Sequence, residues 1–75
     1  MSERLAAIST ACIELDKLLK RESVTATGGE AKLLIAAGEV RVNGETELRK
    51  GRKLRPGDVV ETGNTRLRVV AAGAK

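Results

Sequence analysis

The sequence of 75 residues contains no Phe, Tyr, Trp or His. Without histidine, the chain lacks the side chain that most often exchanges protons near neutral pH and the commonest nitrogen ligand of metals. It also lacks a Ser–His or Cys–His pair and a glycine loop that ends in Gly-Lys-Ser/Thr. Glu14 and Asp16 are close in sequence, but at i and i+2 of a predicted helix they do not share a face. We therefore expect no catalytic residues, and we predict that the protein is not an enzyme.

Cys12 is the only cysteine. One cysteine can form neither an intramolecular disulfide nor a zinc site made of cysteines alone, so we expect Cys12 to be a small, partly buried apolar residue and the protein to hold no metal or cofactor. The first residues lack the basic and apolar regions of a secretory signal, and no apolar run approaches the roughly 20 residues that cross a bilayer. These absences predict a soluble cytoplasmic protein without membrane attachment.

Basic side chains outnumber acidic ones by 14 to 10, which gives a formal net charge of +4. Many of them are clustered in one stretch, Arg49, Lys50, Arg52, Lys53 and Arg55. The nearest acids, Glu47 and Asp58, stand at its borders, so we predict that the cluster is not neutralised locally. An anionic partner would relieve the repulsion among these cations. The alternative is a solvated loop that keeps a small protein soluble.

Apolar spacing predicts two helices. Leu15, Leu18 and Leu19 follow the i, i+3, i+4 pattern, so a first helix should begin near Ile13 and lead into a connection at 21–26. Thr27 and Glu30 form a capping box at the start of a second helix. Gly38 should end that helix, because glycine suits a left-handed C-terminal residue.

After Gly38 the apolar pattern alternates, as in strands. Asn43-Gly44, Pro56-Gly57 and Gly63-Asn64 are turn signals between the predicted strands. Residues 1–10 could be an edge strand or a loose arm, and residues 71–75 should form a frayed tail. We predict one α+β domain over residues 1–75, with two helices packed on a small, mainly antiparallel sheet and a core within about 13–70. The predicted core residues are Leu15, Leu18, Leu19, Leu34, Ile35, Val40, Val42, Leu54, Val60, Leu67 and Val69.

Three segments carry a resemblance to a known family. They are Leu15-Asp16-Lys17-Leu18-Leu19, the run from Thr27 to Gly44 with its capping box and Val-x-Val-Asn-Gly end, and Leu54-x-Pro56-Gly57-Asp58-x-Val60. Their order and spacing over residues 13–61 resemble the S4 RNA-binding domain. The short length looks most like the small YbcJ-type members, and so do Gly28 and Lys32 at the helix start, the cations Arg49, Lys50 and Lys53, and a closing hairpin around Gly63-Asn64. The resemblance implies the αL-type two-helix motif, with folded rRNA or tRNA lying along the second helix and the adjoining loop and strand.

The chain departs from the S4 pattern at several positions. Glu14 and Gly28 stand where arginine is common, and Leu33 and Ala36 replace polar or basic residues on the second helix. RNA binding is therefore expected to shift toward Lys32, Arg41 and the basic cluster. The predicted RNA-binding residues are Lys17, Lys20, Thr27, Gly28, Gly29, Lys32, Arg41, Arg49, Lys50, Arg52 and Lys53.

Some of these residues have a structural alternative. Lys17 and Lys20 also suit the negative end of the first helix. The glycines beside Thr27 expose backbone N–H groups that could bind phosphate, but Glu30 would compete there, and the glycines could simply ease the chain into the helix.

We predict a monomeric protein that binds structured RNA (rRNA, tRNA or a ribonucleoprotein such as the ribosome) through a basic face. The absence of aromatic rings argues against stacking of single-stranded bases and favours recognition of a duplex-containing shape. The alternative is an adaptor whose basic face meets an acidic protein, with Leu33 and Val59 as outward-facing apolar anchors.

Overall fold

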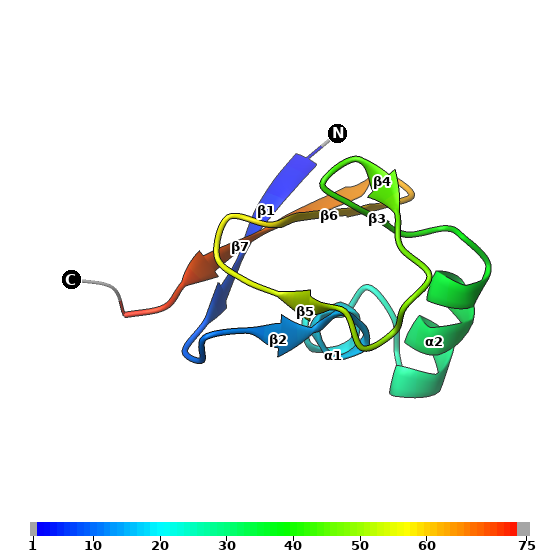
Figure 1. Cartoon of the computed structure of the whole chain (residues 1–75), viewed down its shortest axis with the longest axis horizontal. Helices are drawn as coiled ribbons and strands as arrows, with labels where there is room; N and C mark the ends of the chain where they lie inside the picture. Colours follow the sequence, from blue (N-terminus) through cyan, green and yellow to red (C-terminus); the bar gives the residue numbers. More distant parts are fainter. Residues whose placement is uncertain (1, 74–75) are drawn as a thin grey trace.

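The computed structural model describes residues 2–73, which fold into two helices and two sheets (Figure 1). In chain order the elements are β1 (Ser2–Ile8), β2 (Ile13–Glu14), α1 (Leu15–Arg21), α2 (Gly28–Ala36), β3 (Arg41–Val42), β4 (Glu45–Thr46), β5 (Lys53–Leu54), β6 (Val59–Thr62) and β7 (Thr65–Ala71). None of the helices in the described part of the chain has the length and apolar character needed to cross a membrane.

The larger sheet has the strand order β1-β7-β6-β3-β4. Neighbouring strands are antiparallel except for β1, which lies parallel to β7 with Ser2 opposite Thr65 and Ile8 opposite Ala71. A smaller antiparallel sheet joins β2 to β5. The predicted α+β architecture, with two helices and a mainly antiparallel sheet, is confirmed.

The N-terminal segment is an edge strand, which the sequence alone left open. Ala6 and Ile8 are buried in the core, so the core begins before residue 13, the start that the sequence predicts. At the other end, Ala71 is the last residue of β7 rather than part of a frayed tail, while residues 74–75 lie outside the described part. The pairing of β1 with β7 explains both differences, because each strand keeps the other in the sheet along its whole length.

Glycine turns connect the strands as the sequence predicted. Asn43 and Gly44 both have positive φ, 53° and 85°, as a two-residue turn between β3 and β4 requires. Gly63 has a φ of 56° at the turn between β6 and β7. The Asn43 side chain also bonds Asp58 and the N–H of Val59, which ties this turn to the start of β6.

α1 begins at Leu15, two residues later than predicted, because Ile13 and Glu14 pair with β5 instead. Glu14 supplies no side-chain cap. The first N–H groups of the helix, those of Leu15 and Asp16, donate to the carbonyl oxygens of Arg52 and Lys50 at 2.9 and 3.1 Å. A loop distant in sequence therefore caps this helix, which fixes the loop against α1.

The start of α2 confirms the capping box in modified form. Thr27 Oγ1 accepts from the N–H of Glu30 at 3.1 Å. The Glu30 carboxylate reaches back one residue further than predicted and accepts from the N–H of Ala26 at 2.7 Å. Gly38, with a φ of 76°, follows the end of the helix as expected.

One apolar cluster lies between the helices and the larger sheet. All the predicted core residues are buried except Leu34, which is partly buried and packs against the cluster. Cys12 is half-buried, as predicted. Among residues 2–73, the large apolar side chains that remain exposed are Leu5, Leu33 and Leu48.

Candidate nucleic-acid interface

Glu47 organises the loop that carries the basic cluster. Its side chain is only 8% exposed and bonds two guanidinium groups, Arg49 through Nε at 2.9 Å and Arg52 through Nη1 at 2.6 Å. It also accepts from the backbone N–H of Arg49 at 3.1 Å. The hydrogen bonds from Arg49 and then from Arg52 lower the pKa of Glu47 from 4.5 to about 2. The carboxylate is therefore ionised at neutral pH and holds both arginines in place.

The prediction that the cluster is not neutralised locally was wrong for part of it. Glu47 stood at its border in sequence, but the chain folds back so that its carboxylate lies between Arg49 and Arg52. Lys53 approaches Glu14 at 3.8 Å, and Lys17 approaches the same carboxylate at 3.3 Å. Each of these two acids is thus shared by two cations, and positive charge remains in excess.

Two shallow hollows lie side by side on this surface. The first is lined by Arg49, Gly51, Arg52, Lys53 and Arg55. The second is lined by Cys12, Ile13, Glu14, Lys17 and Lys53. Lys53 borders both, so the fold joins Lys17 from α1 to the cluster. Within residues 2–73, Lys50 and Arg55 form no ion pair.

Lys50 lines neither hollow but is exposed in the same loop, between Arg49 and Gly51. We call the set formed by Lys17, Arg49, Lys50, Arg52, Lys53 and Arg55 the loop surface. The loop that carries most of it runs from β4 to β5 and passes between α2 and the smaller sheet (Figure 1). Arg55 was in the predicted basic cluster but not among the predicted contact residues, and its place in the first hollow adds it to them.

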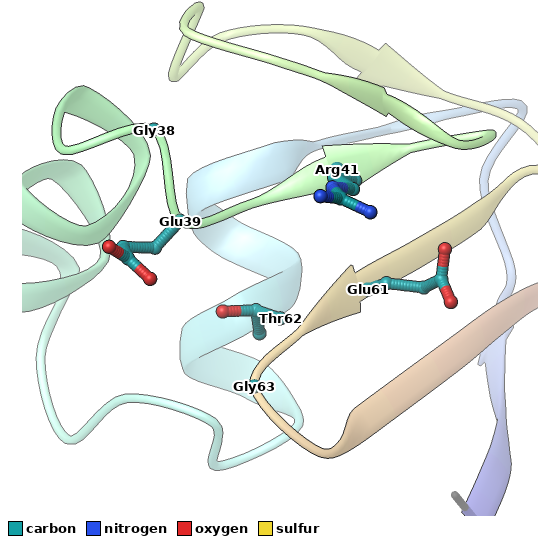
Figure 2. A pocket seen from close by; sticks show the side chains of 6 residues that line it. All are labelled: Gly38, Glu39, Arg41, Glu61, Thr62 and Gly63. Atoms are coloured by element: carbon teal, nitrogen blue, oxygen red, sulfur yellow. The ribbon is translucent and has the colours of Figure 1, made fainter.

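Arg41 lies elsewhere and in acidic surroundings. It lines a separate hollow together with Glu39 and Glu61 (Figure 2). Glu61 lies on β6, directly opposite Arg41 in the sheet. Glu61 is bonded to Arg66 at 2.9 Å. Arg41 and the basic cluster thus line different hollows, so we do not count Arg41 in the loop surface.

The remaining predicted residues lie on the helices. Lys20 is exposed in the last turn of α1, and Lys32 is exposed on α2. Thr27 Oγ1 is occupied by its cap bond, and Glu30 holds its carboxylate at the same end of α2 as Gly28 and Gly29. This carboxylate disfavours an anion at that helix start, as the sequence suggested.

Sequence reasoning missed the two acidic organisers, Glu14 and Glu47. The sequence indicates for Glu14 only a replaced arginine and an unsuitable partner for Asp16. For Glu47 the sequence contains a local signal, because residues two apart in an extended chain lie on the same side, which places Glu47 beside Arg49. The long-range partner Arg52 required the turn at 49–52, which only the folded chain shows.

The family assignment rests on residues 6–70, which match the S4 domain family. The chain belongs to the S4 domain family. Two curated relatives of this S4 domain are similar over most of their length. "Probable ribosome maturation protein RlbA" of Bacillus subtilis (strain 168) is 47% identical over 55 residues, which cover 73% of this chain and 78% of the relative. "Putative RNA-binding protein YbcJ" of Escherichia coli (strain K12) is 41% identical over 59 residues, which cover 79% and 84%.

A solved structure shares the fold of this S4 domain. The solution structure of Escherichia coli YbcJ superposes with a TM-score of 0.73 at 33% identity, covering 95% of this chain and 91% of that chain. It is described as revealing an αL motif involved in RNA binding. The resemblance to the YbcJ-type S4 proteins, stated from the sequence, is confirmed.

Proposed function

We propose that this S4 domain binds structured RNA through the loop surface and catalyses no reaction. The observation that carries the proposal is the unequal sharing of charge there: Glu47 and Glu14 each serve two cations, while Lys50 and Arg55 have no acidic partner within residues 2–73. Excess positive charge held on a fixed backbone attracts phosphates and gains free energy from the counterions that they release.

The similar proteins support the class of partner. One relative is named for ribosome maturation and another for RNA binding, and the motif of the solved YbcJ structure is described as involved in RNA binding. We propose that the RNA is rRNA, met within a ribosomal particle or its precursor. The chain has no aromatic side chain to stack on bases, so a duplex-containing element is the favoured substrate.

The test compares RNA affinity between variants that change net charge equally. The loop variant replaces Arg49, Lys50, Arg52 and Lys53 with Gln and adds Glu47→Gln, so that no carboxylate is left unpaired. The control replaces Arg4, Arg66 and Arg68 with Gln on the strands. Both variants change the formal net charge by −3.

For the unmodified protein and an rRNA hairpin, about five phosphate contacts should give a log–log salt slope between about −3.5 and −4.5. The loop variant should lose at least about 100-fold in affinity and most of that slope, whereas the control should stay within about threefold of the unmodified protein. Equal losses in the two variants would show that only net charge matters and would remove the loop surface as the site.

A second candidate is the adaptor role, which two exposed apolar side chains favour. Leu33 on α2 and Leu48 beside Glu47 are 73% and 62% exposed. Val59, the other anchor that we expected, lies half-buried in β6 and does not serve. Capture of partners from a lysate before and after RNase treatment separates the two functions. Partners that survive RNase and are lost in Leu33→Gln would favour the adaptor.

A further inference from the structure

Gly51 has no structural reason to be glycine. Its φ lies outside the left-handed region, so the backbone does not require it. A Cβ at this position would meet nothing closer than Glu14 Oε2 at 3.9 Å, which is ordinary van der Waals contact. Glycine loses more conformational freedom on folding than other residues, so an unneeded one has a cost. The remaining use of a glycine is to let another molecule come close to the backbone.

The turn around Gly51 presents its N–H group to the solvent side. The N–H of Arg52 donates to the carbonyl of Arg49 at 3.2 Å, which closes the turn, and the carbonyl of Lys50 accepts from Asp16 in α1 at 3.1 Å. In a trans peptide the C=O and N–H point in opposite directions. The N–H of Gly51 therefore points away from α1, and it has no hydrogen-bond partner among residues 2–73.

Cations line the hollow that contains Gly51. Arg49 and Arg52 are held there by the buried Glu47, while Lys53 and Arg55 complete its wall. Guanidinium groups that are already fixed lose less rotational freedom when they bind an anion. Guanidinium donors, an ammonium group and a free backbone N–H together suit the oxygens of a phosphate.

We infer that the hollow around Gly51 seats one phosphate group, with the Gly51 N–H as a donor and Arg49 and Arg52 as fixed counter-charges. This inference rests on the proposed RNA-binding function and specifies where one phosphate contacts the protein. The phosphate is either an internal diester of the RNA backbone or a 5′-terminal monoester, since both present non-bridging, negatively charged oxygens.

The first experiment needs no RNA. Inorganic phosphate is titrated into ¹⁵N-labelled protein at constant ionic strength, with chloride as the comparison ion. The amide resonance of Gly51 and the Nε resonances of Arg49 and Arg52 should shift and saturate with phosphate, and those of Gly63 and Arg68 should not. Shifts spread evenly over all arginines, or no shift at Gly51, would contradict the proposed phosphate site.

The second experiment adds a methyl group without changing charge. Gly51→Ala should fold normally, because the nearest atom to the added Cβ lies 3.9 Å away. Alanine keeps the backbone N–H, but its methyl group should hold the phosphate away from that donor. The affinity for an rRNA hairpin should therefore fall about tenfold, the size expected for one lost charge-assisted hydrogen bond. Hairpins with a 5′-phosphate and a 5′-hydroxyl distinguish the sources: an equal fall with both indicates an internal diester, and a fall confined to the phosphorylated RNA indicates the terminus.

The two proposals can fail separately. If Gly51→Ala binds RNA as tightly as the unmodified protein does, the proposed phosphate site is wrong while the proposed RNA binding stands. If the unmodified protein binds no structured RNA but phosphate still shifts Gly51 selectively, the proposed phosphate site stands as an anion site and the proposed function is wrong.

Discussion

Arginines on the strands and arginines in the loop meet acids in different proportions. On β7, Arg66 bonds Glu61 and Arg68 bonds Glu3, so each guanidinium group has a carboxylate of its own. In the loop, Arg49 and Arg52 share the single carboxylate of Glu47. Similar residue types thus produce a balanced surface on the sheet and an excess of positive charge on the loop. Net charge alone, which is +4 for the chain, does not reveal this division.

The carboxylate in the loop also differs from those on the strands in its surroundings. Glu47 is buried, and its ionised form depends on two bonded guanidiniums, whereas Glu61 and Glu3 lie in more exposed cross-strand pairs. Exposed pairs contribute little to stability, but a buried carboxylate that loses its partners is costly. The comparison can therefore be tested by stability as well as by binding. Because the chain has no aromatic side chains, unfolding is followed by far-ultraviolet circular dichroism.

The largest effect should appear on acidification. Glu47 has a pKa of about 2 in the folded chain against 4.5 for the free side chain. A lowered pKa stabilises the fold fully above pH 4.5, and this contribution disappears as the pH falls toward 2. We expect the free energy of unfolding to fall by about 3 kcal/mol over this range, measured with urea at a series of pH values.

Glu47→Gln is the control for this pH series, since it cannot titrate. Most of the decline should vanish in this variant. Glu3, whose pKa is lowered chiefly by its hydrogen bond to Arg68, leaves a smaller residual slope of the same sign. An unchanged decline in Glu47→Gln would show that other carboxylates control acid unfolding.

The next effect concerns a single arginine. Arg52→Gln removes the 2.6 Å contact to Glu47 and should lower the free energy of unfolding by about 2 kcal/mol, because a buried charged acceptor loses a partner. Adding Glu47→Gln should restore part of this loss, as an amide needs less compensation than a carboxylate. A double-mutant cycle in urea measures the coupling, and additivity of the two changes would contradict the shared-carboxylate arrangement.

A smaller effect is expected when cations of the loop surface are removed without disturbing Glu47. Lys50→Gln with Lys53→Gln leaves Glu47 and its arginines intact but removes two cations of the loop surface. The affinity for an rRNA hairpin should fall about tenfold, and the salt slope should become shallower by about 1.4 to 1.8. The matched pair Arg66→Gln with Arg68→Gln should leave the slope unchanged when the same RNA is titrated at several salt concentrations.

The smallest effect is expected on the sheet. Arg66→Gln breaks a cross-strand pair that is 43% exposed on the arginine side, and the free energy of unfolding should fall by less than about 1 kcal/mol. If this change proved as costly as Arg52→Gln, the two regions would not differ in the way described.

Local signals in the sequence predicted much of this fold. The cap at Thr27, the glycine after α2 and the Asn43-Gly44 turn depend on neighbours within a few residues, so the sequence displays them directly. The start of α1 was misplaced because its cap comes from carbonyl oxygens of Lys50 and Arg52, far along the chain. The parallel partner of β1 was hidden for the same reason.

The candidate site was only partly predictable. The run of cations in the loop was plain in the sequence, and the folded chain adds Lys17 to it through the shared Glu14. The interior position of Glu47 could not be read from Glu-Leu-Arg, where hydropathy would bury the leucine, yet Leu48 is 62% exposed. Arg41 looked equivalent to the other cations because its acidic neighbour Glu61 is brought beside it by strand pairing.

The parallel pairing of β1 with β7 has a consequence for synthesis of the chain. Ser2–Ile8 is made early, but its partner Thr65–Ala71 is made last among the described elements. Until β7 emerges, β1 has no neighbour, and the buried Ala6 and Ile8 lack a place to pack. Contacts between such distant segments slow folding. We therefore expect nascent chains that lack β7 to remain protease-sensitive, and compaction to follow only after the last strand has been translated.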